Sequence, residues 1–299
     1  MCTAICDGHL CGRTLDNEYS YGENVISLKK DFEIPLLYEE KIVLPQGILG
    51  VGIMKRGFPL IYDGINESGL FIAGLNFIGN AFYKPKQAYK LNLASFELIP
   101  YILSACHSIS DVKKELKRIN ITNDSFDKSL GYSQLHWIAS DRESSIVIEP
   151  TRNGIFVFDN PVSVLTNNPP FEYHISNLSN YMALSPKSPI NQLCPNVNLS
   201  IYSRGMGSLG LPGDFSSASR FVRGVFLKNH ISKELDPSKE INRFFYMLNG
   251  VSVPKGCVIS QQGLPVYTIY SSCYDLDNFC LYYKEYDQLA KKHKAISPK

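Results

Sequence analysis

The sequence lacks any long apolar run. No stretch approaches the roughly 18 consecutive apolar residues that a membrane-spanning helix needs, and no signal-peptide pattern opens the chain. Lys and Arg do not run beyond a pair, except at Lys291-Lys292-His293-Lys294. A net charge of only +2 also argues against a nucleic-acid partner. We therefore expect a cytoplasmic protein with neither a membrane nor a nucleic-acid partner.

Disorder and repetition are also missing. Charged residues make up 19% of the chain and hydrophobic residues 44%, which is too apolar for a disordered protein. There is no internal repeat or low-complexity segment. With 299 residues the chain can bury a large core, although composition does not decide between one domain and two.

The cysteines lack the Cys-x-x-Cys spacing of many metal and redox sites. The eight cysteines are scattered, so we expect reduced thiols and no disulfide framework. Cys2, Cys6, His9 and Cys11 raise the question of zinc. On extended backbone Cys2 and Cys6 lie about 13 Å apart, too far for one ion with bonds of about 2.3 Å. The sequence therefore predicts neither a metal nor a cofactor.

What the sequence does have is a cysteine directly after Met1. Removal of Met1 gives Cys2 a thiol and a free α-amine on one residue. An N-terminal amine can take the proton of its own nucleophile. Cys2 is therefore a candidate nucleophile that carries its own base.

The residues after Cys2 predict a hairpin. Asp7-Gly8 between two apolar-rich runs is typical of a two-residue turn. A turn at these residues would pair Cys2 with Arg13, Ala4 with Cys11 and Cys6 with His9. Opposed residues share a face with Cβ atoms about 4.5–5.5 Å apart. The guanidinium of Arg13 would then stabilise the thiolate of Cys2, and Asp16 would reach the positively charged amine.

The remaining elements come as strands, paired helices, strands, paired helices and strands. Helices are expected at 95–106, 110–119, 171–183, 216–229 and 238–248, and strands at 42–53, 58–64, 70–77, 135–140, 145–149, 154–158, 162–166, 265–274 and 279–286. Paired helices between blocks of strands favour antiparallel sheets covered by helix layers. The Gly- and Pro-rich segment 185–214 is too long for a plain connector, so we expect it to line a site or a subunit contact.

Five motifs in order give the chain a family resemblance. They are Cys2, Gly12-Arg13-Thr14-Leu15-Asp16, Ala73-Gly74-Leu75-Asn76-Phe77, Leu165-Thr166-Asn167-Asn168-Pro169, and Gly210-Leu211-Pro212-Gly213-Asp214-Phe215 followed by Ala218-Ser219-Arg220-Phe221. With them the chain resembles the choloylglycine hydrolases, N-terminal nucleophile hydrolases that include bile salt hydrolases and penicillin V acylases. The resemblance runs from Met1 to about Tyr286. It implies an α+β fold, a four-layer αββα sandwich of two antiparallel sheets, as one domain over residues 1–299 and often as a homotetramer.

The resemblance also implies roles for single residues. Cys2 matches the nucleophile, and Arg13 and Asp16 match the partners of its thiol and amine. Asn76 and Asn167 match the oxyanion donors, and Arg220 matches a further cation near the thiolate. The positions that match the family's apolar substrate pocket are Leu15, Tyr62, Phe126, Leu130 and Leu135. The hairpin is several residues shorter than the family pattern, and Thr14 stands where Asn is usual.

The implied reaction is hydrolysis of an amphipathic amide. Penicillin-selective members tend to have Tyr at the position of Asn76, so the resemblance favours glycine- and taurine-conjugated bile salts over penicillin V. The alternative within the family is a penicillin V acylase or another N-acyl amidase. The alternative from another class is a non-catalytic binder of amphipathic acids. We interpret His136 as a core or turn histidine, because an N-terminal amine makes a histidine base superfluous.

Overall fold

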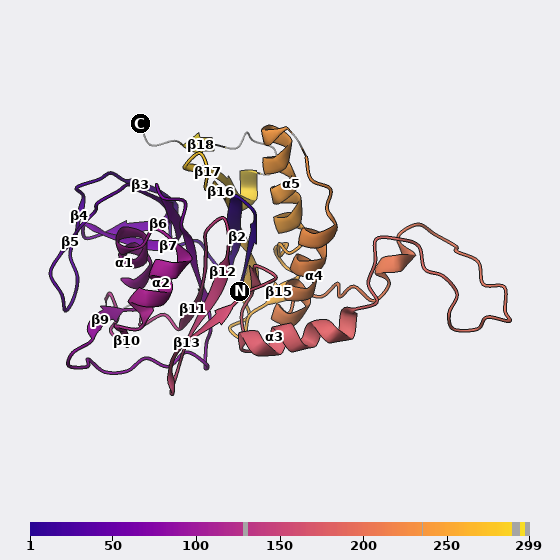
Figure 1. The fold of residues 1–299 in the computed structure, drawn as a ribbon, viewed down its shortest axis with the longest axis horizontal. Helices are drawn as coiled ribbons and strands as arrows, with labels where there is room; N and C mark the ends of the chain where they lie inside the picture. Colours follow the sequence, from indigo (N-terminus) through magenta and orange to yellow (C-terminus); the bar gives the residue numbers. More distant parts are fainter. Residues whose placement is uncertain (128–130, 235, 289–293, 297–299) are drawn as a thin grey trace.

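The computed structural model describes residues 1–127, 131–234, 236–288 and 294–296. Two mainly antiparallel sheets stack face to face, and helices cover both outer faces (Figure 1). The first sheet has the strand order β14-β1-β2-β16-β17-β18, with β15 paired to β16. Its strands are β1 (Cys2–Asp7), β2 (Leu10–Asn17), β14 (Val164–Leu165), β15 (Val258–Ile259), β16 (Pro265–Asp275), β17 (Cys280–Glu285) and β18 (Lys294–Ile296).

The second sheet has the order β13-β12-β11-β8-β7-β6-β3. Its strands are β3 (Asn24–Leu28), β6 (Ile48–Lys55), β7 (Phe58–Asn66), β8 (Phe71–Asn76), β11 (Leu135–Ser140), β12 (Ser145–Thr151) and β13 (Gly154–Asp159). Two small two-stranded sheets lie outside it: β4 (Glu33–Ile34) with β5 (Ile42–Val43), and β9 (Leu91–Ala94) with β10 (Ile119–Thr122).

Apolar faces of the helices hold the layers together. Helices α1 (Leu98–Ala105) and α2 (Ile109–Leu116) pack on the second sheet, and α4 (Ser217–His230) and α5 (Pro237–Asn249) pack on the first. One buried cluster fills the space between the sheets and under α4 and α5, and another lies under α1 and α2. The expected order of helix, sheet, sheet and helix layers is therefore confirmed. Among the helices of the described residues, none is both long and apolar enough to cross a bilayer.

The first hairpin differs from the predicted register. The two loop residues are Gly8 and His9, so that Asp7 pairs with Leu10, Cys6 with Cys11, Ala4 with Arg13 and Cys2 with Leu15. Gly8 has φ of 62° at the first loop position, which suits a type II′ turn. The carboxylate of Asp7 is bound by Arg243 of α5 at 2.7 Å, so Asp7 stays in the strand. The predicted pairs of Cys2 with Arg13, Ala4 with Cys11 and Cys6 with His9 are wrong.

The shift leaves the predicted contact intact. Moving a two-residue loop by one position changes each strand partner by two residues, and residues two apart share a face. Arg13 is therefore a diagonal neighbour of Cys2 and lies on the same face as Leu15.

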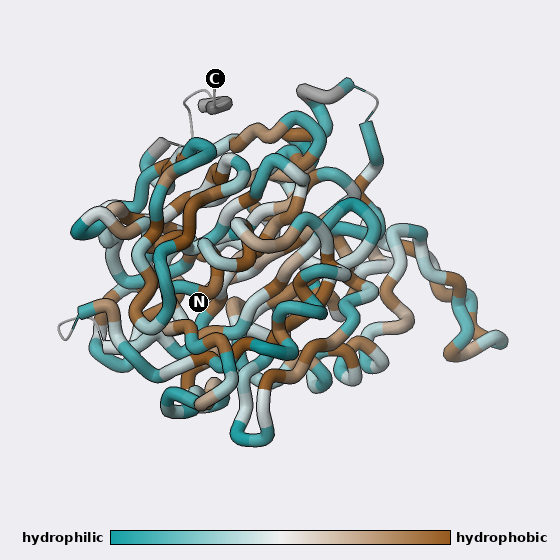
Figure 2. The backbone as a smooth tube through the Cα atoms, turned by 60° about the vertical axis from the view of Figure 1, so that its left-hand side comes forward, coloured by the Kyte–Doolittle hydropathy of each residue, from teal (hydrophilic) through white to brown (hydrophobic). Residues whose placement is uncertain are grey.

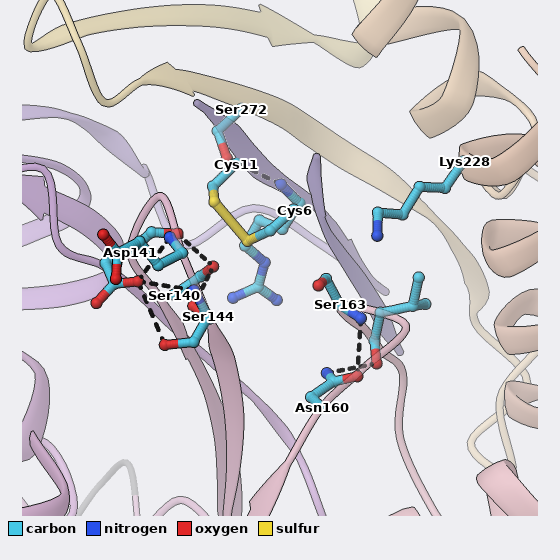
Figure 3. The surroundings of a disulfide bond; sticks show 12 residues. Cys6, Cys11, Ser140, Asp141, Ser144, Asn160, Ser163, Lys228 and Ser272 are labelled. Atoms are coloured by element: carbon cyan, nitrogen blue, oxygen red, sulfur yellow. Dashed lines mark hydrogen bonds between the residues drawn. A yellow bond between two sulfur atoms is a disulfide. The ribbon is translucent and has the colours of Figure 1, made fainter. Parts of the chain in front are cut away.

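The same register brings two cysteines together. Cys6 and Cys11 are directly opposed, with Cα atoms 4.1 Å apart, and form a disulfide. Figure 3 shows this bond on the hairpin, with Ser272 of β16 and Lys228 of α4 nearby. The expectation of reduced thiols is wrong for this pair, whereas the other six cysteines are free thiols.

The long segment between α3 (Phe171–Asn177) and α4 extends away from the sheets (Figure 1). The expected helix at 171–183 ends early, because a 3-10 turn follows it at Leu178–Tyr181. We call residues 182–209 the arm. Figure 2 shows that apolar and polar stretches alternate along it. Its most exposed apolar residues are Met182, Ile190, Leu193, Tyr202 and Leu209.

Candidate active site

Cys2 and Arg13 face each other across the first hairpin. The guanidinium Nη2 of Arg13 donates to Sγ of Cys2 at 2.5 Å. Both residues are almost fully buried, with 2% and 1% of their surfaces exposed. A cation this close to a thiol favours the thiolate, the nucleophilic form.

Backbone carbonyls of the second sheet fix the guanidinium of Arg13. Its Nη1 donates to the carbonyl of Gly74 at 2.6 Å and to that of Tyr62 at 3.5 Å. Burial alone would lower the pKa of Arg13, but attraction to Cys2, Tyr270, Asp63 and Asp16 raises it above its ordinary value. Arg13 is therefore a permanent cation at this position.

Asp16 lies further along β2 and is buried beside the first residue of the chain. Its Oδ1 accepts from the hydroxyl of Thr268 at 2.7 Å, and its Oδ2 accepts from Thr14 at 3.3 Å. Its backbone pairs with Met1, because the terminal nitrogen of Met1 donates to the carbonyl of Asp16 at 2.6 Å. The carboxylate is therefore held by two threonine hydroxyls, while the backbone of Asp16 pairs with the residue before Cys2.

Asn167 lies just after β14 and uses both ends of its side chain. Its Oδ1 accepts from the nitrogen of Cys2 at 2.8 Å and from Nη2 of Arg220 at 2.8 Å. Its Nδ2 donates to the carbonyl of Asn76 at 2.9 Å. Because an arginine can only donate, this contact fixes which end of the amide is the oxygen. Asn167 therefore connects β1, β8 and α4 around Cys2.

Arg220 contacts the backbone of Cys2 instead of its sulfur. Its Nη1 donates to the carbonyl of Cys2 at 2.5 Å and to the hydroxyl of Thr3 at 2.6 Å. Ser216 caps α4 by accepting from the backbone nitrogen of Ser219, which places Arg220 in the first turn of the helix. Burial lowers the pKa of Arg220, although attraction to Asp16 and Cys2 opposes this. The expected cation therefore lies close to Cys2, but it binds β1 through the carbonyl of Cys2 and the hydroxyl of Thr3, not through the sulfur.

A cavity of about 480 Å³ opens beside these residues. Cys2, Arg13 and Asp16 line one part of it together with Asn76, the last residue of β8. Four of the predicted pocket residues also line it: Leu15, Tyr62, Phe126 and Leu135. Leu130 lies outside the described residues. Apolar walls with a few convergent polar groups are typical of a small-molecule site.

The site contains residues that the sequence analysis did not identify. Asp63 of β7 is completely buried and accepts hydrogen bonds from Tyr270, Ser272 and Tyr274 of β16. A lone carboxylate inside the apolar run 58–64 was a usable signal, because Asp is rarely buried unless it is paired. Thr268, the partner of Asp16, carried no such signal.

His136 is a core residue, as expected. It is fully buried, its Nδ1 lies 3.2 Å from Glu149, and its Nε2 lies 2.9 Å from the carbonyl of Thr166. Its ring stacks on Phe77. Across the described part of the chain, no group of three or more His, Cys, Asp or Glu is arranged to hold a metal ion.

Comparison with known proteins agrees with this geometry. The family model described as linear amide C–N hydrolases, choloylglycine hydrolase family, matches residues 2–295. The chain belongs to this family. The resemblance drawn from the five motifs is therefore confirmed, and this choloylglycine hydrolase family member is a hydrolase that acts on linear amides.

Several relatives are similar over nearly the whole hydrolase. A bile salt hydrolase/transferase of Lactiplantibacillus plantarum is 44% identical over 96% of this chain and 90% of that protein. A conjugated bile acid hydrolase of Lactobacillus gasseri is 36% identical over 92% of this chain and 89% of that protein.

Solved structures confirm the N-terminal nucleophile hydrolase fold. The C2A mutant of the conjugated bile acid hydrolase from Clostridium perfringens has a TM-score of 0.90 and 31% identity, over 99% of this chain and 92% of that chain. The penicillin V acylase of Agrobacterium tumefaciens has a TM-score of 0.75 and 19% identity, over 99% of this chain and 84% of that chain. At 19% identity this second likeness concerns the fold alone.

Proposed function

We propose that this hydrolase cleaves the amide bond of glycine- or taurine-conjugated bile salts through the thiolate of Cys2. The observation that carries the proposal is the 2.5 Å contact between Sγ of Cys2 and Arg13 at the wall of a largely apolar cavity. The names of the bile salt and bile acid hydrolases to which the chain is similar support this choice of substrate.

The reaction begins when the thiolate attacks the amide carbonyl. A carbon–sulfur bond forms, and negative charge moves to the carbonyl oxygen. Asn76 lines the same cavity as Cys2, and its side-chain amide is the first donor that we assign to this oxygen. Asn167 has a second N–H besides the one that the carbonyl of Asn76 accepts, and we assign it as the other donor. Removing one such donor typically costs about 10²–10³ in rate.

The second half of the reaction needs the nitrogen of Cys2. With Met1 in place this nitrogen is an amide that donates to Asn167. Removal of Met1 turns it into an amine at the same position, with Asp16 to stabilise its charged form. The amine gives a proton to the departing glycine or taurine nitrogen as the carbon–nitrogen bond breaks. Water then attacks the thioester, which releases the bile acid and restores the thiol.

The cavity fits a large apolar acyl group. Leu15, Tyr62, Phe126 and Leu135 contribute apolar walls, while the polar head of the conjugate extends to solvent. Asn76 instead of Tyr, by the family resemblance, argues against penicillin V as the preferred substrate.

Product release from both substrate classes tests the proposal. Incubation with glycocholate and taurocholate should release glycine and taurine much faster than incubation with penicillin V releases phenoxyacetate. Cys2→Ala should abolish the release of glycine and of taurine. Cys2→Ser is the matched variant, because it keeps the size and shape of the nucleophile. Absence of turnover of both bile conjugates would contradict the choice of substrate.

A binder of amphipathic acids is the alternative from another class. It predicts an intact Met1 and no reaction of Cys2 with a thiol reagent. The proposal instead predicts that the intact mass lacks Met1 and that iodoacetamide labels Cys2 in addition to the exposed thiols of Cys194 and Cys257.

The proposal includes self-association to a homotetramer and a cytoplasmic location. Exposed apolar residues of the arm supply a surface for self-association. Six free thiols fit a reducing compartment, whereas the Cys6–Cys11 disulfide does not. Cell fractionation with detection of the protein decides the location.

A further inference from the structure

Close to Arg13, and not among the residues that line the cavity, lies the buried carboxylate of Asp63. Oδ1 of Asp63 is 3.9 Å from Nη1 of Arg13, and neither residue has more than 1% of its side chain exposed. The two atoms are too far apart for a hydrogen bond. The interaction is therefore one of charge, not of direct hydrogen bonding.

Hydroxyl groups of β16 occupy the oxygens of Asp63. Tyr270 donates to its Oδ1, while Ser272 and Tyr274 each donate to its Oδ2 at 2.7 Å. Burial raises the pKa of Asp63, whereas the charge of Arg13 and these three donors oppose that shift and favour the charged form. Because these donors satisfy the carboxylate, Asp63 does not compete with Cys2 for the Nη2 group of Arg13.

The hydrogen bonds of Arg13 do not neutralise its charge. Apart from Cys2, its acceptors are the backbone carbonyls of Thr14, Gly74 and Tyr62. A buried cation without a counterion is strongly destabilising. The thiolate of Cys2 is one counterion, but under the proposed function its charge is lost whenever the sulfur forms a thioester.

We propose that Asp63 is a permanent counterion of Arg13, a positioning residue that balances the charge of the buried guanidinium while the sulfur of Cys2 is neutral. The proposal rests on the proposed function for the moment at which the charge is lost. The counterion effect itself is independent of the substrate. It therefore can be measured without turnover.

The first test is the pH dependence of alkylation of Cys2. Asp63 repels the thiolate and shares the positive potential of Arg13, so Asp63→Asn should lower the pKa of the Cys2 thiol by about one unit. The control Ser272→Ala removes the hydrogen bond to Asp63 and the one from the backbone nitrogen of Arg13 but keeps the charge, and it should shift this pKa by much less. If Asp63 only kept Arg13 in position, Asp63→Asn would raise the thiol pKa, because a displaced guanidinium stabilises the thiolate less. An unchanged or raised pKa in Asp63→Asn overturns the proposal.

The second test removes the sulfur and with it the thiolate charge. Cys2→Ala should leave the melting temperature of the full chain nearly unchanged, because Asp63 remains beside Arg13. The double variant with Asp63→Asn should melt lower than the sum of the two single effects predicts. Additive effects overturn the proposal. If Asp63→Asn does not fold, Cys2→Ala alone decides, because a large loss of stability in it means that the thiolate was the main counterion.

The two proposals fail separately. A protein that shows the expected alkylation and melting shifts but releases no glycine or taurine retains the counterion role and loses the bile salt assignment. A protein that hydrolyses bile salts but lacks these shifts retains the bile salt assignment and loses the counterion role.

Discussion

At the scale of single residues, the side-chain oxygen and nitrogen of Asn167 have different partners and cannot exchange positions. Its oxygen accepts from Cys2 and Arg220, and its nitrogen donates to the carbonyl of Asn76. Asn167→Asp keeps the acceptor but sets a second oxygen against that carbonyl. We expect a loss in kcat/KM of about 10²–10³ for glycocholate. The neighbouring Asn168→Asp is the control, because Asn168 donates to Ile78 instead, and equal losses in the two variants would contradict this role.

Glu97 gives a second prediction at this scale, for stability against pH. Burial raises the pKa of Glu97 to about 7 from an ordinary value of 4.5, although hydrogen bonds from the backbone of Ala94 and Leu37 oppose the shift. Between these two values the folded protein binds more protons than the unfolded chain. This group therefore lowers stability as the pH rises from about 4.5 to about 7, by up to about 3 kcal/mol, and has no further effect above that window.

The measurement is the free energy of unfolding across that pH window. Glu97→Gln should be less stable at low pH, because its amide accepts from only one of the two backbone groups. Its stability should fall less steeply with rising pH than that of the unchanged protein. Parallel curves for the two proteins would rule out the titration of Glu97 as the cause.

Residue types predicted part of the site and missed the rest for a physical reason. Cys2, Arg13 and Asp16 lie close together in sequence, so a single turn was enough to predict their proximity. Asp63 meets Tyr270, Ser272 and Tyr274 only because two sheets stack. Such contacts depend on the register of strands that are more than 200 residues apart, which no local pattern contains.

At the scale of elements, the first hairpin shows why an inexact register still gave the correct neighbour. The turn lies one residue later than Asp7-Gly8 predicts, and this moves partners by two positions without changing the face. An ion pair of Asp7 with Arg243, which lies far along the chain, favoured that turn. The short strand β3 and the parallel pair β9 and β10 were missed, since each is stabilised by a distant partner more than by its own pattern.

Gly12 gives the prediction at this scale. A Cβ at Gly12 would lie 1.9 Å from the backbone oxygen of Ser272, so Gly12→Ala must separate β2 from β16. We expect a loss of about 3 kcal/mol in the free energy of unfolding, measured by chemical denaturation. Because Arg13 follows directly, alkylation of Cys2 should also slow. The control is Gly213→Ala, whose Cβ would meet nothing within 4 Å; a similar cost for both would contradict the close-packing argument.

At the scale of the whole molecule, the layer order followed from paired helices between blocks of strands. The position of the arm could not be predicted from the sequence in the same way. Its length indicates a function but not the direction in which the segment extends. In the structure it extends beyond the layers while its base is fixed (Figure 1). Arg223 of α4 donates to the carbonyls of Pro212 and Asp214, and the backbone of Ser185 donates to Gly207. An extended segment with a fixed base presents its apolar residues in one defined place.

The proposed self-association through the arm gives the last prediction. Ile190, Leu193 and Tyr202 have 82%, 86% and 78% of their surfaces exposed, and apolar groups so exposed are typical of interaction surfaces. Changing all three to Lys should convert the assembly to smaller species in light scattering, because charges at the centre of an apolar interface are costly. The rate of Cys2 alkylation should stay the same, since the arm does not line the cavity.

The matched control is Ile259→Lys, because Ile259 is an apolar residue with 58% exposure outside the arm. It should leave the mass of the assembly unchanged. If the triple variant keeps the same mass as the unchanged protein, the arm is not the contact. If the triple variant becomes smaller and also loses reactivity at Cys2, association supports the hairpin that carries the nucleophile. The base of the arm gives a route for that effect, because Arg223 and Arg220 lie on the same helix and Arg220 binds the carbonyl of Cys2.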